Sequence, residues 1–98
     1  MDRAAAIDIL RSHEGKLRKR GVRHAALFGS VARGDATATS DVDVVIVLDR
    51  ETVRDVYDYV GVVHFIEDMF PVTVDAANRE TFEERVRQNA ERDAIDAF

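Results

Sequence analysis

The chain has 98 residues, of which 46% are hydrophobic and 34% charged, and its net charge at pH 7 is −5. This length and mixture predict one small globular domain over residues 1–98, with no room for a second, substrate-binding domain. The acidic net charge disfavours a nucleic-acid partner. The chain has no cysteine, no secretory leader pattern and no apolar stretch near ~20 residues. We therefore expect a cytoplasmic protein without a membrane segment.

The first predicted elements are a helix over residues 4–20 and a short strand over residues 22–28. Gly21 is placed to end the helix. The residues that share its apolar side at helical spacing are Ala6, Ile7, Leu10, His13 and Leu17. The basic residues between 11 and 23 are expected to form a solvated face. None of the three histidines has the i, i+4 spacing of a helical metal site, so they are expected to be packing or surface residues.

The strand at 22–28 leads directly into Gly29-Ser30, and a short helical segment is predicted at 31–33. A turn of this kind exposes backbone N–H groups together with a hydroxyl, and such a turn binds phosphate oxygens. Gly29 would let a ligand approach the backbone, Ser30 would donate its hydroxyl, and Arg33 would add a planar cation. Alone, Gly-Ser is most often an ordinary turn, so the phosphate interpretation depends on the residues that follow.

Residues 41–48 predict the central strand of the domain. Its apolar run is continuous after the start, which is typical of a strand buried on both faces. Asp41 and Asp43 fall on the same face because strand side chains alternate with a period of two. Two carboxylates so placed repel each other unless a proton or a cation lies between them. The pair therefore indicates a divalent-ion site at the edge of a cleft.

The second half of the chain predicts a helix over 52–70, a short strand over 71–75, and a final helix that begins at the capping-box pattern Thr81-x-x-Glu84. The inner face of the final helix is expected to carry Phe82, Val86, Ala90 and Ala97. Residues 56–70 carry more apolar surface than one stripe needs. Either this surface meets another chain, a partner or a second copy, or residues 62–66 are the well-buried half of the helix.

The pattern of Gly29-Ser30, a small polar loop, and Ser40-Asp41-x-Asp43 resembles the nucleotidyltransferase superfamily of DNA polymerase beta. It is most similar to the minimal MNT-type members, the antitoxins of HEPN/MNT toxin–antitoxin pairs, and the likeness covers nearly the whole chain. The resemblance implies an α+β (or α/β) nucleotidyltransferase fold, with helices packed on a small mixed sheet of three or four strands. The carboxylates would lie in a cleft at one end of that sheet.

The resemblance also implies the activity, which is transfer of AMP from ATP to a hydroxyl. In the antitoxin members the acceptor is a tyrosine of the partner HEPN-type toxin, and two Mg2+ ions assist the reaction. The residues implied to bind the nucleotide and its phosphates are Gly29, Ser30, Arg33 and Ser40. The residues implied to be catalytic and to hold the metal are Asp41, Asp43 and Asp75.

The third carboxylate departs from the family pattern. Aligning Pro71-Val72 with the segment that usually precedes it puts Thr73 at the carboxylate position, and Asp75 lies two residues further on. Asp75 would serve as the third metal ligand if its strand were shifted by one residue pair against the neighbouring strand. Without that shift, the site lacks its third ligand. The alternative function is then a weakened nucleotidyltransferase that neutralises its partner by binding alone. A small-molecule nucleotidyltransferase is disfavoured because 98 residues leave no second domain for the acceptor.

Overall fold

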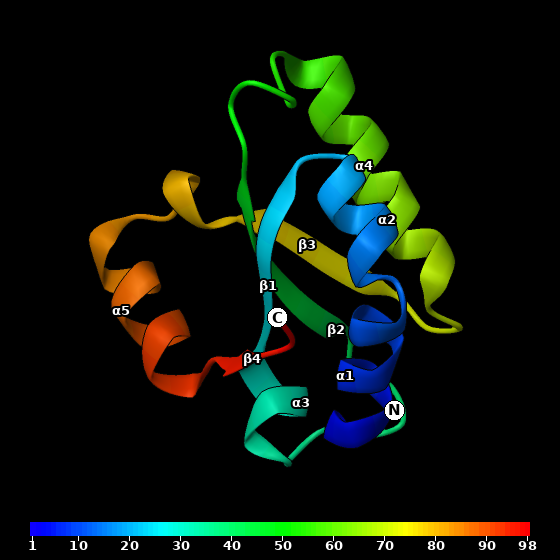
Figure 1. Ribbon diagram of the computed structural model, residues 1–98. Helices are drawn as coiled ribbons and strands as arrows, with labels where there is room; N and C mark the ends of the chain where they lie inside the picture. The colour runs from blue at the N-terminus through cyan, green and yellow to red at the C-terminus, as the bar shows by residue number, and fades with distance from the viewer.

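A four-stranded mixed sheet in the order β3-β2-β1-β4 forms the centre of the computed structural model, which describes all residues 1–98 (Figure 1). The strands are β1 (Val22–Phe28), β2 (Val42–Leu48), β3 (Val74–Asn78) and β4 (Ile95–Asp96). The two inner strands are β1 and β2, and β1 is antiparallel to both β2 and β4. Strands β2 and β3 are parallel, and the connection between them contains α4 (Val56–Met69). The α+β class and the mixed sheet agree with the sequence prediction.

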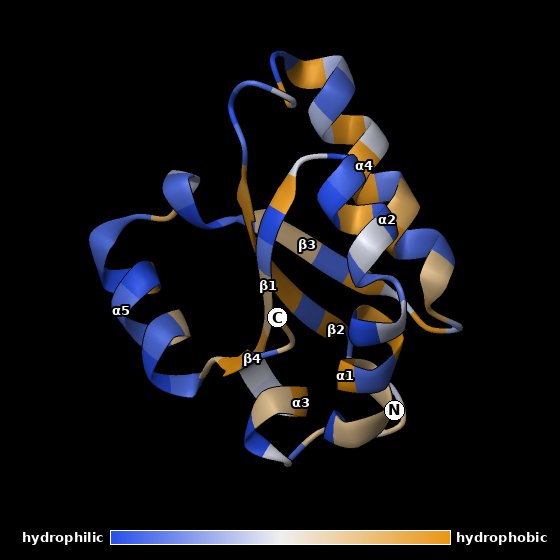
Figure 2. Ribbon diagram, viewed as in Figure 1, coloured by the Kyte–Doolittle hydropathy of each residue, from blue (hydrophilic) through white to orange (hydrophobic).

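The main core lies on the sheet face covered by α1 (Arg3–Ser12), α2 (Glu14–Lys19) and α4 (Figures 1 and 2). Alternate residues of the strands point into it, and their partners come from the helices. The largest side chains with under 2% exposure include Leu10, Leu17, Leu27, Ile46 and Ile66. Each buried aliphatic side chain of this size contributes about 1.5–3 kcal/mol relative to an exposed one. This face therefore anchors the sheet that carries the site.

The opposite face of the sheet carries Asp43, Val45 and Val47 and is here called the carboxylate face. It is partly covered by α5 (Glu84–Asp93), which lies on the other side of the sheet from α1, α2 and α4 in Figure 1, and by the short 3-10 helix η1 (Arg79–Thr81). The one-turn helix α3 (Gly29–Arg33) follows β1 directly and ends at Gly34, whose φ is +82°. Strands β1 and β2 and the short helix after Gly29 form where the sequence predicts them.

The predicted first helix is broken at His13 into α1 and α2. The Ser12 hydroxyl donates to the carbonyl oxygens of Asp8 and Ile9, and Nδ1 of His13 lies 2.8 Å from the Ile9 carbonyl oxygen. These side chains occupy carbonyl groups that the next helical turn would use, which explains the break. Gly21, with φ of +99°, ends α2 as expected.

Helix α4 begins at Val56, four residues later than predicted, because the Asp55 side chain caps it by accepting from the backbone N–H of Asp58 at 2.9 Å. Of residues 62–66, Val62 and Ile66 are buried, Val63 and Phe65 are half-buried and His64 is exposed, so the buried-half interpretation holds for one side of the helix. Val56, Tyr57 and Val60 remain 72%, 87% and 41% exposed. Contact of this surface with another chain or a second copy stays a prediction. None of the helices has the length and apolar composition that crossing a bilayer requires.

The predicted boundaries after residue 70 are wrong. Strand β3 starts at Val74 rather than Pro71. The capping box does not form, because the Thr81 hydroxyl donates to the Asn78 carbonyl oxygen at 2.8 Å within η1, and α5 starts at Glu84. Val86 is 45% exposed and is not on the inner face. Ala97 is buried but follows β4 instead of belonging to the helix.

Candidate functional site

Asp43 and Asp75 lie beside each other on the carboxylate face. In the sheet, Asp43 pairs with Phe28 of β1 and with Asp75 of β3. Residues paired in register on adjacent strands are about 4.8 Å apart and point to the same face. We call this row of Phe28, Asp43 and Asp75 the carboxylate rung. Asp41, the third predicted carboxylate, precedes β2 and is exposed.

The sheet places Asp75, and not Thr73, next to Asp43. Thr73 lies before the start of β3, and its carbonyl oxygen accepts a hydrogen bond from the Val42 backbone N–H at 3.0 Å. Because β3 pairs with β2 from Val74 onward, Val74 falls opposite Val42 and Asp75 falls opposite Asp43. Of the two candidates, Asp75 is therefore the one that lies beside Asp43 in the sheet.

Gly29 is in direct contact with the Asp43 carboxylate. Its φ of +74° is a conformation that favours glycine. A Cβ added there would overlap Oδ2 of Asp43 and lie 3.2 Å from its Cγ. The chain turns here into α3, whose first backbone N–H groups have no helical carbonyl partner. The strand end, the turn with Ser30 and the carboxylate rung thus form one continuous surface.

Negative charge dominates the electrostatics of this surface. Burial raises the pKa of the Asp43 carboxyl, and the charges of Asp75 and Asp41 raise it further, while Arg33 acts in the opposite direction. Ionised oxygens crowded in this way are ligands of the kind that a hard cation such as Mg2+ prefers. No three acidic, histidine or cysteine side chains in the structure form a ready-made ligand set for a metal ion. The donor chemistry fits Mg2+, and the carboxylates have to turn toward one another to hold it.

Arg33 and Ser40 lie at the edge of the site, where both are engaged in local contacts. The Arg33 guanidinium donates to Asp35 at 3.2 Å and to Asp93 of α5 at 3.3 Å, and the hydrogen bond to Asp35 is the main reason that its pKa is raised. Ser40 accepts from the Thr37 backbone N–H at 2.9 Å. Arg33 therefore ties α3 to α5, and Ser40 closes the turn that precedes Asp41.

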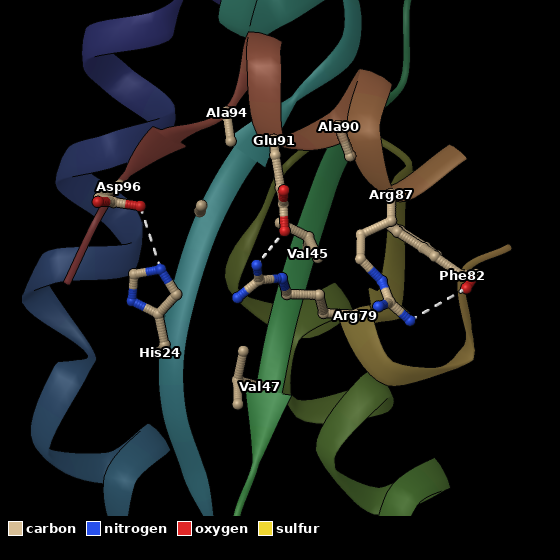
Figure 3. A pocket seen from close by; sticks show the side chains of 11 residues that line it. His24, Val45, Val47, Arg79, Phe82, Arg87, Ala90, Glu91, Ala94 and Asp96 are labelled. Atoms are coloured by element: carbon tan, nitrogen blue, oxygen red, sulfur yellow. Dashed lines mark hydrogen bonds and ion pairs between the residues drawn. The ribbon is translucent and has the colours of Figure 1, made fainter. Parts of the chain in front are cut away.

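A cavity of about 230 Å3 on the carboxylate face was not anticipated from the sequence (Figure 3). It lies between α5 and the floor formed by β1 and β2. The residues that line it are His24, Ala26, Val45, Val47, Arg79, Phe82, Arg87, Ala90, Glu91, Ala94 and Asp96. The available signal was the alternation in β1, which puts His24, Ala26 and Phe28 on one face. Without the position of α5, that alternation does not reveal a cavity.

Comparison with known proteins points to one family. The model of the nucleotidyltransferase domain matches residues 10–97. A Methanocaldococcus jannaschii protein with the provisional name protein adenylyltransferase is 31% identical over 90 residues, which cover 90% of each chain. Protein adenylyltransferase MntA of Thermococcus cleftensis is 28% identical over 88 residues, covering 89% of this chain and 87% of the relative.

Solved structures show the same arrangement. A structure described provisionally as a minimal nucleotidyltransferase superposes with a TM-score of 0.72 at 26% identity, covering 97% of this chain and 95% of the other. A toxin–antitoxin structure with AMP-PNP superposes with a TM-score of 0.70 over 90% of this chain and 72% of the other. The latter pair is 16% identical, so it supports the fold alone.

Proposed function

The chain belongs to the nucleotidyltransferase domain family, in its minimal MNT-type branch, and on that premise we propose that it transfers AMP from ATP, with Mg2+, to a tyrosine hydroxyl of a HEPN-type toxin. It would act as the antitoxin of that partner. The observation that carries the proposal is the contact of Gly29 with Asp43 in a rung that also contains Asp75. The names of two relatives, both protein adenylyltransferases, support the reaction class.

In this reaction the acceptor oxygen attacks the α-phosphorus, the bond from that phosphorus to the bridging oxygen breaks, and pyrophosphate leaves. The protein contributes positioning and charge compensation more than covalent chemistry. The Gly29 and Ser30 backbone and the Ser30 hydroxyl would hold the terminal phosphates. Asp41, Asp43 and Asp75 would hold Mg2+, which neutralises the phosphate charge and lowers the pKa of the attacking hydroxyl. Arg33 and Ser40 would support the edges of the phosphate site.

The second candidate function is neutralisation of the partner by binding alone. The sequence-based reason for it was the threonine at position 73, and the pairing of Asp75 with Asp43 weakens that reason. The observation that favours it is the absence of a ready-made set of three ligands. Both functions share a toxin partner, as in the toxin–antitoxin structure to which this fold is similar.

The test is to mix the protein with the product of the neighbouring gene, ATP and Mg2+, and to measure the intact mass of that partner. Transfer predicts a gain of one or more AMP units on a tyrosine, located by peptide sequencing. The matched control is the double variant Asp41→Asn/Asp43→Asn, which should still bind the partner but leave its mass unchanged. A tight complex of two folded proteins, with no mass change for the unaltered protein, would refute transfer and leave neutralisation by binding.

A further inference from the structure

The cavity beneath α5 continues the surface of the carboxylate rung. The next row of paired residues on this face lies two residues away from the carboxylate rung along each strand. In it, Ala26 of β1 pairs with Val45 of β2 and with Asp96 of β4. Val45 also pairs with Ala77 of β3. Two residues further again, His24 pairs with Val47. Each step of two residues is about 6.7 Å long. The cavity floor therefore begins one step from Asp43 and extends away from it.

Small side chains leave the space empty. Ala26 on the floor, Ala90 of α5 and Ala94, the residue that directly follows α5, contribute only methyl groups. Phe82 lines the cavity and also packs edge-to-face on Phe28 of the carboxylate rung, with ring centroids 5.9 Å apart. The aromatic pair thus connects the cavity to the phosphate end of the site. At about 230 Å3, the cavity is below the ~300 Å3 at which drug-sized ligand pockets begin, so it suits a single heterocycle rather than a whole nucleotide.

The polar groups around the cavity are balanced in charge. In Figure 3, Arg79 reaches across it to Glu91, and Nε2 of His24 lies 3.1 Å from Asp96 on the other side. The two lining arginines, Arg79 and Arg87, are matched in number by the two lining carboxylates, Glu91 and Asp96, so the cavity has no strong net field for a phosphate. An apolar floor with a few polar groups at its edge is typical of a site for a neutral ring.

Arg87 supplies an independent sign of a missing acceptor. Its Nε is buried and has no hydrogen-bond partner. Its terminal nitrogens make only long contacts, at 3.5 Å to the Phe82 carbonyl oxygen and 3.7 Å to Glu84. Buried donors without a partner are rare in folded proteins. The ring nitrogens and carbonyl oxygens of a nucleobase are acceptors of the kind that this guanidinium lacks, and guanidinium planes also stack on bases.

We propose that this cavity receives the base of the nucleoside triphosphate whose phosphates lie at Gly29 and Ser30. The proposal rests on the proposed function, which supplies the nucleotide. The nucleotide then lies along the carboxylate face, with its reacting phosphate over the carboxylate rung and its ribose spanning the step between that rung and Ala26. Phe82 packs against the ribose and base edge, and Arg79 and Arg87 reach the heteroatoms of the base.

The first experiment needs no substitution. Backbone amide chemical shifts of the 15N-labelled protein are recorded with Mg2+ plus ATP and with Mg2+ plus inorganic tripolyphosphate, which has no base. The amides of Gly29 and Ser30 should shift with both ligands, while those of Val47, Ala90 and Ala94 should shift with ATP only. Shifts by ATP that stay confined to the Gly29 region would overturn the proposal. No shifts with either ligand would overturn the proposed function, and this inference with it.

The second experiment fills the cavity. Ala94→Leu places a larger side chain at a half-buried position directly after α5. The control Val86→Leu enlarges a residue of α5 that does not line the cavity. Calorimetric titration should show at least tenfold weaker ATP binding for Ala94→Leu, with tripolyphosphate binding within twofold of the unaltered protein. Val86→Leu should match the unaltered protein for both ligands. If Ala94→Leu binds ATP as tightly as the unaltered protein, the proposal is overturned. This holds even if the variant no longer transfers AMP to the partner.

Discussion

Replacing Asp43 by Asn should stabilise the protein in the absence of metal. Asp43 is partly buried, and its nearest charged neighbours on the sheet are carboxylates. At the strand spacing of about 4.8 Å, two unit charges repel by ~1 kcal/mol in water and by ~3 kcal/mol at an effective dielectric constant of 20. Because Asp43 is not fully buried, solvent screening keeps the effect near the lower value. For a domain of this size, about 1 kcal/mol raises Tm by about 4–8 °C.

The pH dependence of this gain follows from the direction of the pKa shift. A carboxyl whose pKa is raised by folding costs stability where it is ionised, above the raised pKa. It costs nothing below the ordinary value of 3.8, where it is protonated in both the folded and the unfolded state. The Tm advantage of Asp43→Asn should therefore be full at neutral pH and should disappear as the pH falls toward 3.8.

Differential scanning calorimetry across pH, with and without Mg2+, measures the effect. Mg2+ at tenfold its Kd should stabilise the unaltered protein by about 1.4 kcal/mol and the variant by much less. Asp49→Asn is the matched control, because Asp49 accepts from the Glu51 N–H at 3.0 Å and its replacement should lower Tm. If Asp43→Asn melts at or below the temperature of the unaltered protein at neutral pH, the charge argument is refuted.

Three further substitutions, two of them paired with a control variant, test the site and its supports. Gly29→Ala should lower the free energy of unfolding in urea by about 1–2 kcal/mol because of the positive φ at this position. It should also abolish ATP binding because the new Cβ overlaps Asp43. The control Gly15→Ala, at a helical position with open space, should instead raise the free energy of unfolding by about 0.5–1 kcal/mol. Asp75→Asn should reduce the transfer rate at least 100-fold, whereas Thr73→Val should stay within a few-fold, and equal effects of the two would contradict the register argument. Arg33→Gln should lower Tm by no more than a few degrees, and by less at high salt, because its ion pairs with Asp35 and Asp93 are exposed and screened by solvent.

The strands β1 and β2 and the turn at Gly29 were predictable because their determinants are local. The continuous apolar run after Asp43, and the Gly-Ser pair at the end of a strand, specify these elements without help from distant residues. The break at His13 was not predictable from helical periodicity, because it depends on the side chains of Ser12 and His13 bonding to carbonyl groups of the preceding turn. Strand β4 has two residues and exists only because β1 offers it an edge.

The sequence could not decide whether Thr73 or Asp75 lies beside Asp43, and the reason differs from that for the helix break. Both residues alternate correctly with the same apolar neighbours, so the pattern within the strand permits either. The choice depends on which residue of β3 pairs with Asp43, and that is a property of two strands separated by the whole of α4. The cavity was unpredictable in the same sense, since it requires the placement of α5 over β1 and β2.

The parallel register of β2 and β3 also protects the site against misassembly. If β3 slipped by one residue, Val74 or Ala76 would stand beside Asp43, and Asp75 would turn toward the face covered by the helices. That slip would expose the buried side chain of Val74 and force a carboxylate into the core, a penalty of several kcal/mol. A chain that has packed its core correctly has therefore already aligned its carboxylates. Packing of the hydrophobic interior therefore also sets the geometry of the candidate site, before any ligand binds.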